Sequence, residues 1–120
     1  MMTKPLVNSL PDCPVETTVL LLGSKWNILI LRDLLQGPLR FTELQRSIGS
    51  ISQKVLTSKL REMEERGIIH RQIFPEVPLR VEYSLTELGL TLKPIIDSMY
   101  QWGEWYKNQI SYSTDPSFPR

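Results

Sequence analysis

The sequence of 120 residues predicts a mainly α-helical domain with one small β-hairpin, an α+β fold. Three observations predict it. Before residue 67, apolar residues recur at helical spacing in segments separated by glycine, proline or serine. Between residues 68 and 85 the period becomes extended, and from residue 86 a long helical stripe follows. The 41% content of hydrophobic residues suffices for one domain with one core.

Composition excludes several classes of protein. The net charge is only +1, so any affinity for a polyanion must come from the placement of charge. No run of about 18 apolar residues is present, and the start of the chain lacks an apolar signal core, so we expect a cytoplasmic protein with no membrane association. The single cysteine rules out an internal disulfide, and with a single histidine it argues against a structural zinc site. We expect no cofactor.

The chain begins with an aperiodic stretch. Residues 1–12 contain two prolines and are predicted to form an N-terminal arm. A helix should start at Pro14, a favourable first helical residue, and Gly23 should end it. Val15, Val19 and Leu22 form one apolar row on this helix, and Leu20 and Leu21 form another. A helix that is apolar on more than one side needs more than one neighbour.

The next helix is predicted to be the centre of the core. Ser24 can cap a helix over residues 25–35, which carries seven large apolar residues. Gly37 and Pro38 then stop it, and residues 39–41 have room for a minimal edge strand. Thr42 with a glutamine three residues later predicts a capping box for a short helix over residues 43–48.

The helix of residues 52–67 has two unlike faces. Ser52 can cap its start, and Gly67 supplies a left-handed stop. Leu56, Leu60 and Met63 form a core stripe. The other face carries polar side chains uninterrupted by acid, namely Gln53, Lys54, Thr57, Ser58 and Arg61. Glu62, Glu64 and Glu65 come only afterwards, and we expect them to face away from DNA. Such a face suits the major groove.

Two strands and a final helix follow. Residues 68–74 and 79–85 should pair as a hairpin around a proline-bounded loop, and the alternation at residues 80–85 predicts a half-buried strand. Residue 86 starts the last helical region, in which Pro94 should bend the helix or separate a short helix from one beginning near Lys93. A domain over residues 13–110 is thus predicted, with a flexible tail at 111–120.

This order of elements describes a winged helix-turn-helix. The sequence also resembles the HxlR-type family of bacterial transcription regulators, relatives of the MarR group, across about residues 13–106. The matching stretches are Cys-Pro at 13–14, Gly-Ser-Lys-Trp at 23–26 with residues 30–34, residues 41–44 with 51–57, and residues 60–61 with 81–89. Ser24 is a small departure, since glycine is commonest there. The resemblance implies a homodimer that binds a pseudo-palindromic operator, usually as a repressor and sometimes as an activator.

Within this fold, the side chains best placed to contact bases are Gln53, Lys54, Thr57 and Ser58. Arg61 is expected on a phosphate, because long cations near a helix centre reach the backbone more easily. Arg80, just past the wing tip, is expected in the minor groove or on a phosphate, and Arg40 and Lys25 are expected on phosphates. An ordinary solvated surface is the alternative for these cations, and Lys25 has the further alternative of covering the dimer seam.

The last helix has more aromatic area than a small core can bury. We expect the N-terminal and C-terminal helices to form the dimer interface, through Val15, Val19, Leu22, Met99, Trp102, Trp105 and Tyr106. A two-fold dimer would place two recognition helices about one DNA turn, roughly 34 Å, apart. The alternative is that these residues complete an intramolecular core.

Cys13 is the remaining candidate for chemistry. Unpaired amides at the helix start favour its thiolate form. The resemblance implies thiol-based sensing, since a cysteine at this position senses electrophiles in several relatives. An inert thiol at the interface is the alternative. Without a second cysteine, oxidised Cys13 could bond only to Cys13 of a partner subunit or to a small molecule.

The residues give less support to two other classes of protein. The sequence has no paired carboxylates in a recognisable setting, no glycine-rich phosphate loop and no nucleophile beside a base, so we do not expect an enzyme. A winged-helix interaction module without DNA binding is the stronger alternative, and the acid-free face of residues 53–61 argues against it. A small-molecule effector would fit between the helices, although no motif marks its site.

Overall fold

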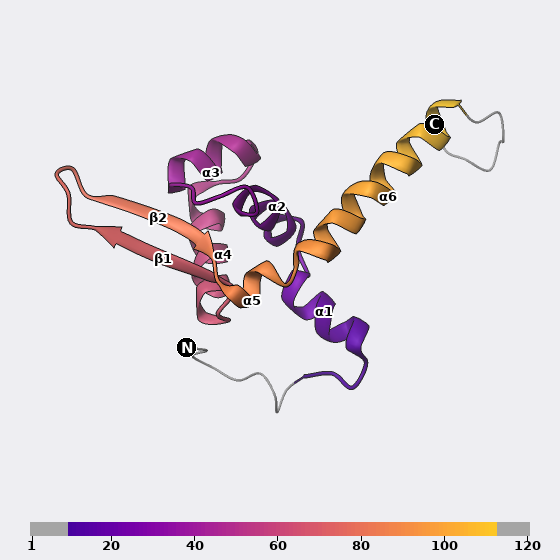
Figure 1. Ribbon diagram of the computed structural model, residues 1–120, viewed down its shortest axis with the longest axis horizontal. Coiled ribbons are helices and arrows are strands. Elements are labelled where there is room, and N and C mark those ends of the chain that lie inside the picture. Colours follow the sequence, from indigo (N-terminus) through magenta and orange to yellow (C-terminus); the bar gives the residue numbers. More distant parts are fainter. Residues whose placement is uncertain (1–9, 113–120) are drawn as a thin grey trace.

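The structure, a computed structural model, describes residues 10–112. The predicted arm and tail therefore lie almost wholly outside the described residues. The elements are α1 (Pro14–Leu22), α2 (Lys25–Leu34), α3 (Phe41–Ile48), α4 (Gln53–Glu65), β1 (Ile69–Phe74), β2 (Arg80–Leu85), α5 (Glu87–Leu90) and α6 (Lys93–Tyr112). The hairpin and α6 project to opposite sides of a centre formed by α2, α3 and α4 (Figure 1). The prediction of a mainly helical winged helix-turn-helix is confirmed.

The predicted helix ends at the two central helices are confirmed. The hydroxyl of Ser24 accepts a hydrogen bond from the amide of Asn27 at 3.3 Å, and the hydroxyl of Ser52 accepts one from the amide of Val55 at 3.1 Å. Each satisfies an amide that the helix itself leaves unpaired. Gly67 follows α4 with φ of 75°, a left-handed conformation that glycine adopts without strain. These caps fix where α4 starts and where the chain turns into the hairpin.

The start of α3 was predicted wrongly. The helix begins at Phe41 rather than at residue 43, and Thr42 is not its cap. The carboxylate of Glu43 accepts a hydrogen bond from the backbone amide of Arg40 at 2.8 Å, so Arg40 is the N-cap residue. The predicted edge strand is reduced to one bridge between Leu39 and Tyr83, with both backbone hydrogen bonds formed, at 3.0 and 2.8 Å.

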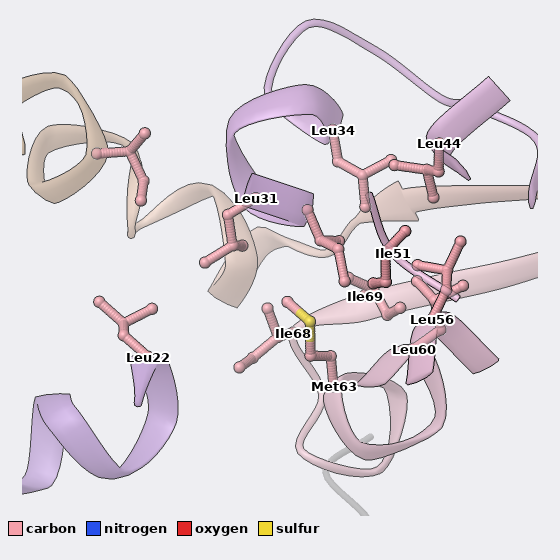
Figure 2. Packing of buried hydrophobic residues seen from close by; sticks show 12 residues of the cluster. Leu22, Leu31, Leu34, Leu44, Ile51, Leu56, Leu60, Met63, Ile68 and Ile69 are labelled. Carbon is pink, nitrogen blue, oxygen red and sulfur yellow. The ribbon is translucent and has the colours of Figure 1, made fainter. Parts of the chain in front are cut away.

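The core lies where α2, α3, α4 and the base of β1 meet. The predicted stripe of α4 is fully used, since Leu56, Leu60 and Met63 are 2% exposed or less. Figure 2 shows these side chains among others of the cluster. The core residues are Leu22, Ile30, Leu31, Leu34, Leu44, Ile51, Leu56, Leu60, Met63, Ile68, Ile69 and Ile96. Burial of each such side chain contributes about 1.5–3 kcal/mol, so the back of α4 is firmly attached and its front is left to solvent.

The hairpin pairs in one antiparallel register, with Arg71 opposite Tyr83 and Phe74 opposite Arg80. The predicted alternation of burial along β2 is not observed, because all six of its residues are half-buried. Two contacts account for this. The bridge at Leu39 covers the outer edge of β2, and the guanidinium of Arg80 lies 3.6 Å from the centre of the Phe74 ring. Residues 70–73 in the middle of β1 remain exposed, while Phe74 at its outer end is half-buried.

Pro94 separates two helices, which was one of the two predicted outcomes. The hydroxyl of Thr86 accepts a hydrogen bond from the amide of Gly89 at 3.0 Å and caps the short helix α5. Gly89 lies against the backbone of Ile68, where a Cβ atom would come within 2.2 Å of the carbonyl oxygen. α6 then starts at Lys93 with Pro94 in its first turn, where the lost amide has no helical partner. Within residues 10–112, no helix has the length and apolar character to cross a membrane.

Candidate nucleic-acid interface

The front of α4 is an exposed polar surface. Gln53, Lys54, Ser58 and Arg61 are exposed and Thr57 is half-buried. All five line one shallow depression on the molecule, as the helical spacing predicts. Lys54 and Arg61 make no ion pair within the described residues, so both cations remain available to an anionic partner.

The prediction that the acids of α4 face away from this surface is wrong. Glu62 and Glu65 line the same depression, further along the helix, and Glu64 lines a neighbouring cavity. Glu62 is paired with Arg66, with 3.2 Å between the carboxylate and the guanidinium. Because an α-helix has about 3.6 residues per turn, Glu62 lies one turn after Ser58 and Glu65 lies one turn after Arg61, on the same side of α4. The acid-free part of the surface is therefore confined to residues 53–61 of α4.

Arg80 is held by its own hairpin. Its guanidinium donates hydrogen bonds to Glu76 at 2.7 and 3.2 Å and to Glu82, and it stacks on the ring of Phe74. Its side chain is only 23% exposed. Two carboxylates around one guanidinium leave a net negative group at the wing, so a phosphate would have to displace them. The expected contact of Arg80 with DNA stays a prediction.

The hydrogen bond from Arg80 lowers the pKa of the Glu76 carboxyl; burial opposes this shift, and the charges of Arg80 and then of Arg40 add to it. Because the folded-state pKa of Glu76 is the lower one, the contact stabilises the wing fully above the unfolded pKa. It is lost as the pH falls through the folded pKa. The wing contact should therefore persist at neutral pH and fail only in acid.

Replacement of Arg80 by methionine tests this contact. We expect Arg80→Met to raise the pKa of Glu76 toward its ordinary value, because the donor of the stabilising hydrogen bond is gone. The measurement is a titration of side-chain carboxyl carbons by NMR. Arg71→Met, on the other strand, removes a guanidinium that does not contact Glu76 and should leave this pKa unchanged. An identical Glu76 titration in Arg80→Met and in the wild type would refute the contact.

The other predicted phosphate contacts are exposed. Arg40 lies at the start of α3, and its influence on Glu76 places it near the wing. Lys25 lies in the first turn of α2, with its ammonium group 4.4 Å from the centre of the Trp26 ring. His70 and Arg71 are exposed on β1, and Arg71 lies 3.8 Å from the carboxylate of Glu64. None of these positions conflicts with a phosphate contact.

The predicted dimer residues divide into two groups. Val15 and Val19 on α1 are 70% and 58% exposed, and Trp102 and Trp105 on α6 are 61% and 51% exposed. Met99 is also exposed, and Tyr106 stacks on Trp102 with 5.1 Å between the ring centres. Leu22, in contrast, is buried in the core of the chain itself, so its predicted place in the dimer interface is wrong. The excess aromatic area that the sequence predicts on the last helix is therefore present at the surface of one protomer.

Cys13 is exposed and is the N-cap residue of α1. Its side chain makes no capping hydrogen bond, while its carbonyl accepts one from the amide of Thr17 at 3.0 Å. The thiol is thus accessible to reagents, and the helix does not depend on it for its cap. Among residues 10–112, no three side chains are grouped to hold a metal ion.

Sequence reasoning missed two features. The C-terminal carbonyls of α1 are satisfied by other elements, since Arg66 donates to the carbonyl of Leu20 and Asn27 donates to that of Leu21, both at 3.2 Å. Arg71 and Tyr83 also lie beside α4, around the cavity that Glu64 lines. The predicted strands, residues 68–74 and 79–85, would pair Arg71 with Glu82 when counted back from the loop, whereas the observed strands pair Phe74 with Arg80 and hence Arg71 with Tyr83.

The sequence of this chain is similar to those of known proteins. The sequence model of the family described as HxlR-like helix-turn-helix matches residues 21–111. The chain is 49% identical over 98 residues to YdeP of Bacillus subtilis (strain 168), described as an uncharacterized HTH-type transcriptional regulator. This match covers 82% of the chain and 77% of YdeP.

Solved structures share the fold. The redox regulator HypR in its reduced form matches with a TM-score of 0.77 and 43% identity, over 82% of this chain and 98% of HypR. Its oxidized form matches with a TM-score of 0.74 and 48% identity, over 77% of this chain and 95% of HypR. Diamide-treated YodB from B. subtilis matches with a TM-score of 0.66 and 42% identity, over 78% of this chain and 93% of YodB.

Proposed function

This chain belongs to the HxlR-like helix-turn-helix family of transcriptional regulators, and we propose that it is a repressor that binds a pseudo-palindromic operator as a homodimer. One observation carries the proposal of sequence-specific binding. The front of α4 holds Gln53, Lys54, Thr57 and Ser58 on one surface, while the back of the same helix is locked into the core. Side chains on a rigidly held helix can discriminate bases by hydrogen bonding in the major groove.

The cations have different roles in the proposed contact with DNA. Lys54 and Arg61 have no ion pair within the described residues, so Lys54 is available to contact a base and Arg61 to neutralise a phosphate. Arg40 and Lys25 lie outside α4 and would extend the contact along the backbone. Arg80 would join only after release from Glu76 and Glu82. Phosphate contacts of this kind set the register of the protein on DNA, while the α4 side chains select the sequence.

A homodimer is supported by apolar surface on two elements. Val15, Val19, Met99, Trp102 and Trp105 are all exposed on one protomer. Large exposed apolar side chains gathered on a helix are typical of a protein–protein interface. In the proposed dimer, α1 and α6 of the two protomers cover one another and set the distance between the two α4 helices. Repression is the role that the family resemblance implies, because a bound dimer obstructs the promoter.

We infer further that Cys13 senses electrophiles. It is exposed at the start of α1, the helix that carries Val15 and Val19 into the proposed dimer seam. Modification there would alter the seam and hence the spacing of the α4 helices. The structural relatives support this direction, since HypR is a redox regulator and YodB was solved after treatment with diamide.

A mobility-shift experiment tests the proposal. We expect the wild-type protein to retain a fragment from upstream of its own gene or a neighbouring gene, with specific Kd of roughly 10⁻⁸ M or lower. The log of affinity should fall linearly with the log of salt concentration, since phosphate contacts release counterions. A scrambled fragment of equal length is the control. Failure to retain any fragment at low salt would instead favour a protein-interaction module.

A further inference from the structure

A small cavity of about 180 Å³ lies between α4 and the hairpin. At roughly 30 Å³ per water molecule it has room for a group of several heavy atoms. Its lining residues are Thr57, Leu60, Arg61, Glu64, Arg71 and Tyr83. Leu60 is buried at 2% exposure and forms an apolar floor, while every other lining side chain is polar. A polar cavity beside a candidate DNA surface is a candidate binding site.

The fold brings these residues together from two elements. Thr57, Arg61 and Glu64 are spaced by four and three residues, so they share the face of α4 that is turned toward the hairpin. Arg71 and Tyr83 are cross-strand partners. The backbone N–H and C=O of Tyr83 bond to Leu39 on the other side, so Arg71 and Tyr83 are a non-hydrogen-bonded pair. The side chains of such a pair lie especially close together.

Hydrogen-bond donors dominate this cavity. Two guanidinium groups and one carboxylate give its walls a net charge of +1. Arg61 has no ion pair within the described residues, and Arg71 reaches Glu64 only at 3.8 Å, beyond hydrogen-bond distance. The hydroxyls of Thr57 and Tyr83 have no hydrogen-bond partner among the described side chains and backbone. Two guanidinium groups and two hydroxyls against one carboxylate leave an excess of donors, which suits a singly charged anion.

Burial raises the pKa of the Tyr83 phenol above its ordinary value; the charge of Arg71 opposes this shift, Glu64 adds to it, and Arg61 opposes it. The net direction keeps the phenol protonated at neutral pH. Tyr83 therefore serves as a neutral donor that can hydrogen-bond to an anion without adding to the charge of the cavity.

We propose that this cavity binds one phosphodiester group of the DNA backbone, held by the guanidinium groups of Arg61 and Arg71 and the hydroxyls of Thr57 and Tyr83. The proposal rests on the DNA binding proposed above; it adds two residues, Arg71 and Tyr83, to it and reassigns Thr57 from a base contact to a phosphate contact. The guanidinium of Arg71 lies 3.8 Å from the carboxylate of Glu64, which also lines the cavity. The bound phosphate would fix the angle between α4 and the hairpin on the duplex.

The DNA backbone is favoured over a free anion because the cavity is continuous with the depression on the front of α4. Thr57 and Arg61 line both this cavity and the depression on the front of α4. A duplex that presents its major groove to Gln53 and Ser58 would therefore carry one strand of its backbone past the cavity mouth. A free anion would meet a net charge of only +1, because Glu64 offsets one of the two guanidinium groups.

Tyr83→Phe is the decisive variant, because it removes one hydroxyl that has no described partner and keeps the ring. We expect it to lower affinity at least tenfold, by about the same factor for operator and scrambled DNA, since a phosphate contact carries no sequence information. Its thermal unfolding should match the wild type. Tyr100→Phe, at a tyrosine that is 70% exposed on α6, is the matched control and should bind DNA like the wild type.

Arg71→Met supplies the second arm. It should lower affinity and also reduce the slope of log affinity against log salt by about one per protomer. The proposal is overturned if the wild type binds the operator and Tyr83→Phe binds it equally well, or if Arg71→Met leaves the slope unchanged. A wild type that binds no DNA would instead overturn the proposed function and this site together.

Titration with inorganic phosphate in the absence of DNA separates the two sources of anion. Nε–H resonances of Arg61 and Arg71 should shift only weakly at millimolar phosphate, and operator DNA should shift both strongly. Saturable phosphate binding that is lost in Tyr83→Phe, combined with unchanged DNA affinity of that variant, would identify a site for a free anion. That result would overturn the assignment to the DNA backbone.

Discussion

Trp102→Glu should convert the protein into a monomer and lower its affinity for the operator by at least about 100-fold. Trp102 is 61% exposed, stacks on Tyr106 and lies 6.1 Å from the ring centre of Trp105. If this cluster is the dimer seam, a carboxylate in its centre would be buried without a partner, at a cost of several kcal/mol per protomer. A monomer has one α4 helix and loses the advantage of two linked contacts.

The measurement is sedimentation at micromolar concentration, followed by titration of operator DNA. Lys107→Glu is the matched control, because it places a new carboxylate on the opposite side of α6, at a side chain that is 77% exposed. It should remain dimeric and bind DNA, with at most a small change in salt dependence. A dimeric Trp102→Glu variant would mean that the dimer interface lies elsewhere. A monomeric wild type would contradict the proposal that the protein is a dimer.

Cys13→Ser should abolish the response to thiol reagents while leaving operator binding intact. The side chain of Cys13 makes no capping bond, and serine is a better N-cap than cysteine, so α1 should be retained or slightly stabilised. With diamide and glutathione, the wild type should form a mixed disulfide at Cys13, while diamide takes up the two electrons and two protons. We expect its operator affinity to change about tenfold, a typical coupling between two sites.

In Cys13→Ser the same treatment should change affinity less than about twofold, because no thiol remains in the chain. Intact-mass measurement confirms the adduct in the wild type and its absence in the variant. A variant that still releases the operator under diamide would show that the signal does not act through Cys13. A wild type that carries the adduct and binds unchanged would assign Cys13 the role of an inert surface thiol.

Much of the fold could be predicted because local rules and the core agree. The caps at Ser24 and Ser52, the stop at Gly67 and the stripe of Leu56, Leu60 and Met63 all follow from short-range sequence patterns. The start of α3 could not be predicted from the Thr42 pattern, because two overlapping caps compete there. The backbone amide of Arg40 bonds to Glu43, and the bridge at Leu39 holds the preceding residues extended.

The part of the candidate site that lies on α4 alone could be predicted from the sequence. The parts formed by several elements could not. Spacing alone placed Gln53, Lys54, Thr57, Ser58 and Arg61 on one surface. The partners of Arg80 depend on a fold of the wing loop that brings Glu76 back toward β2. The cavity at Tyr83 depends on strand register and on the packing of the hairpin against α4. Such contacts between distant segments leave no periodic signal in the sequence.

The most direct test of the central claim is the spacing of the DNA half-sites. Two α4 helices in a two-fold dimer should protect two half-sites whose centres are about one helical turn apart, roughly 34 Å. Insertion of about five base pairs between the half-sites rotates one of them by half a turn and should reduce affinity to that of a single half-site. Equal affinity for the operator and the inserted operator would contradict paired recognition by α4.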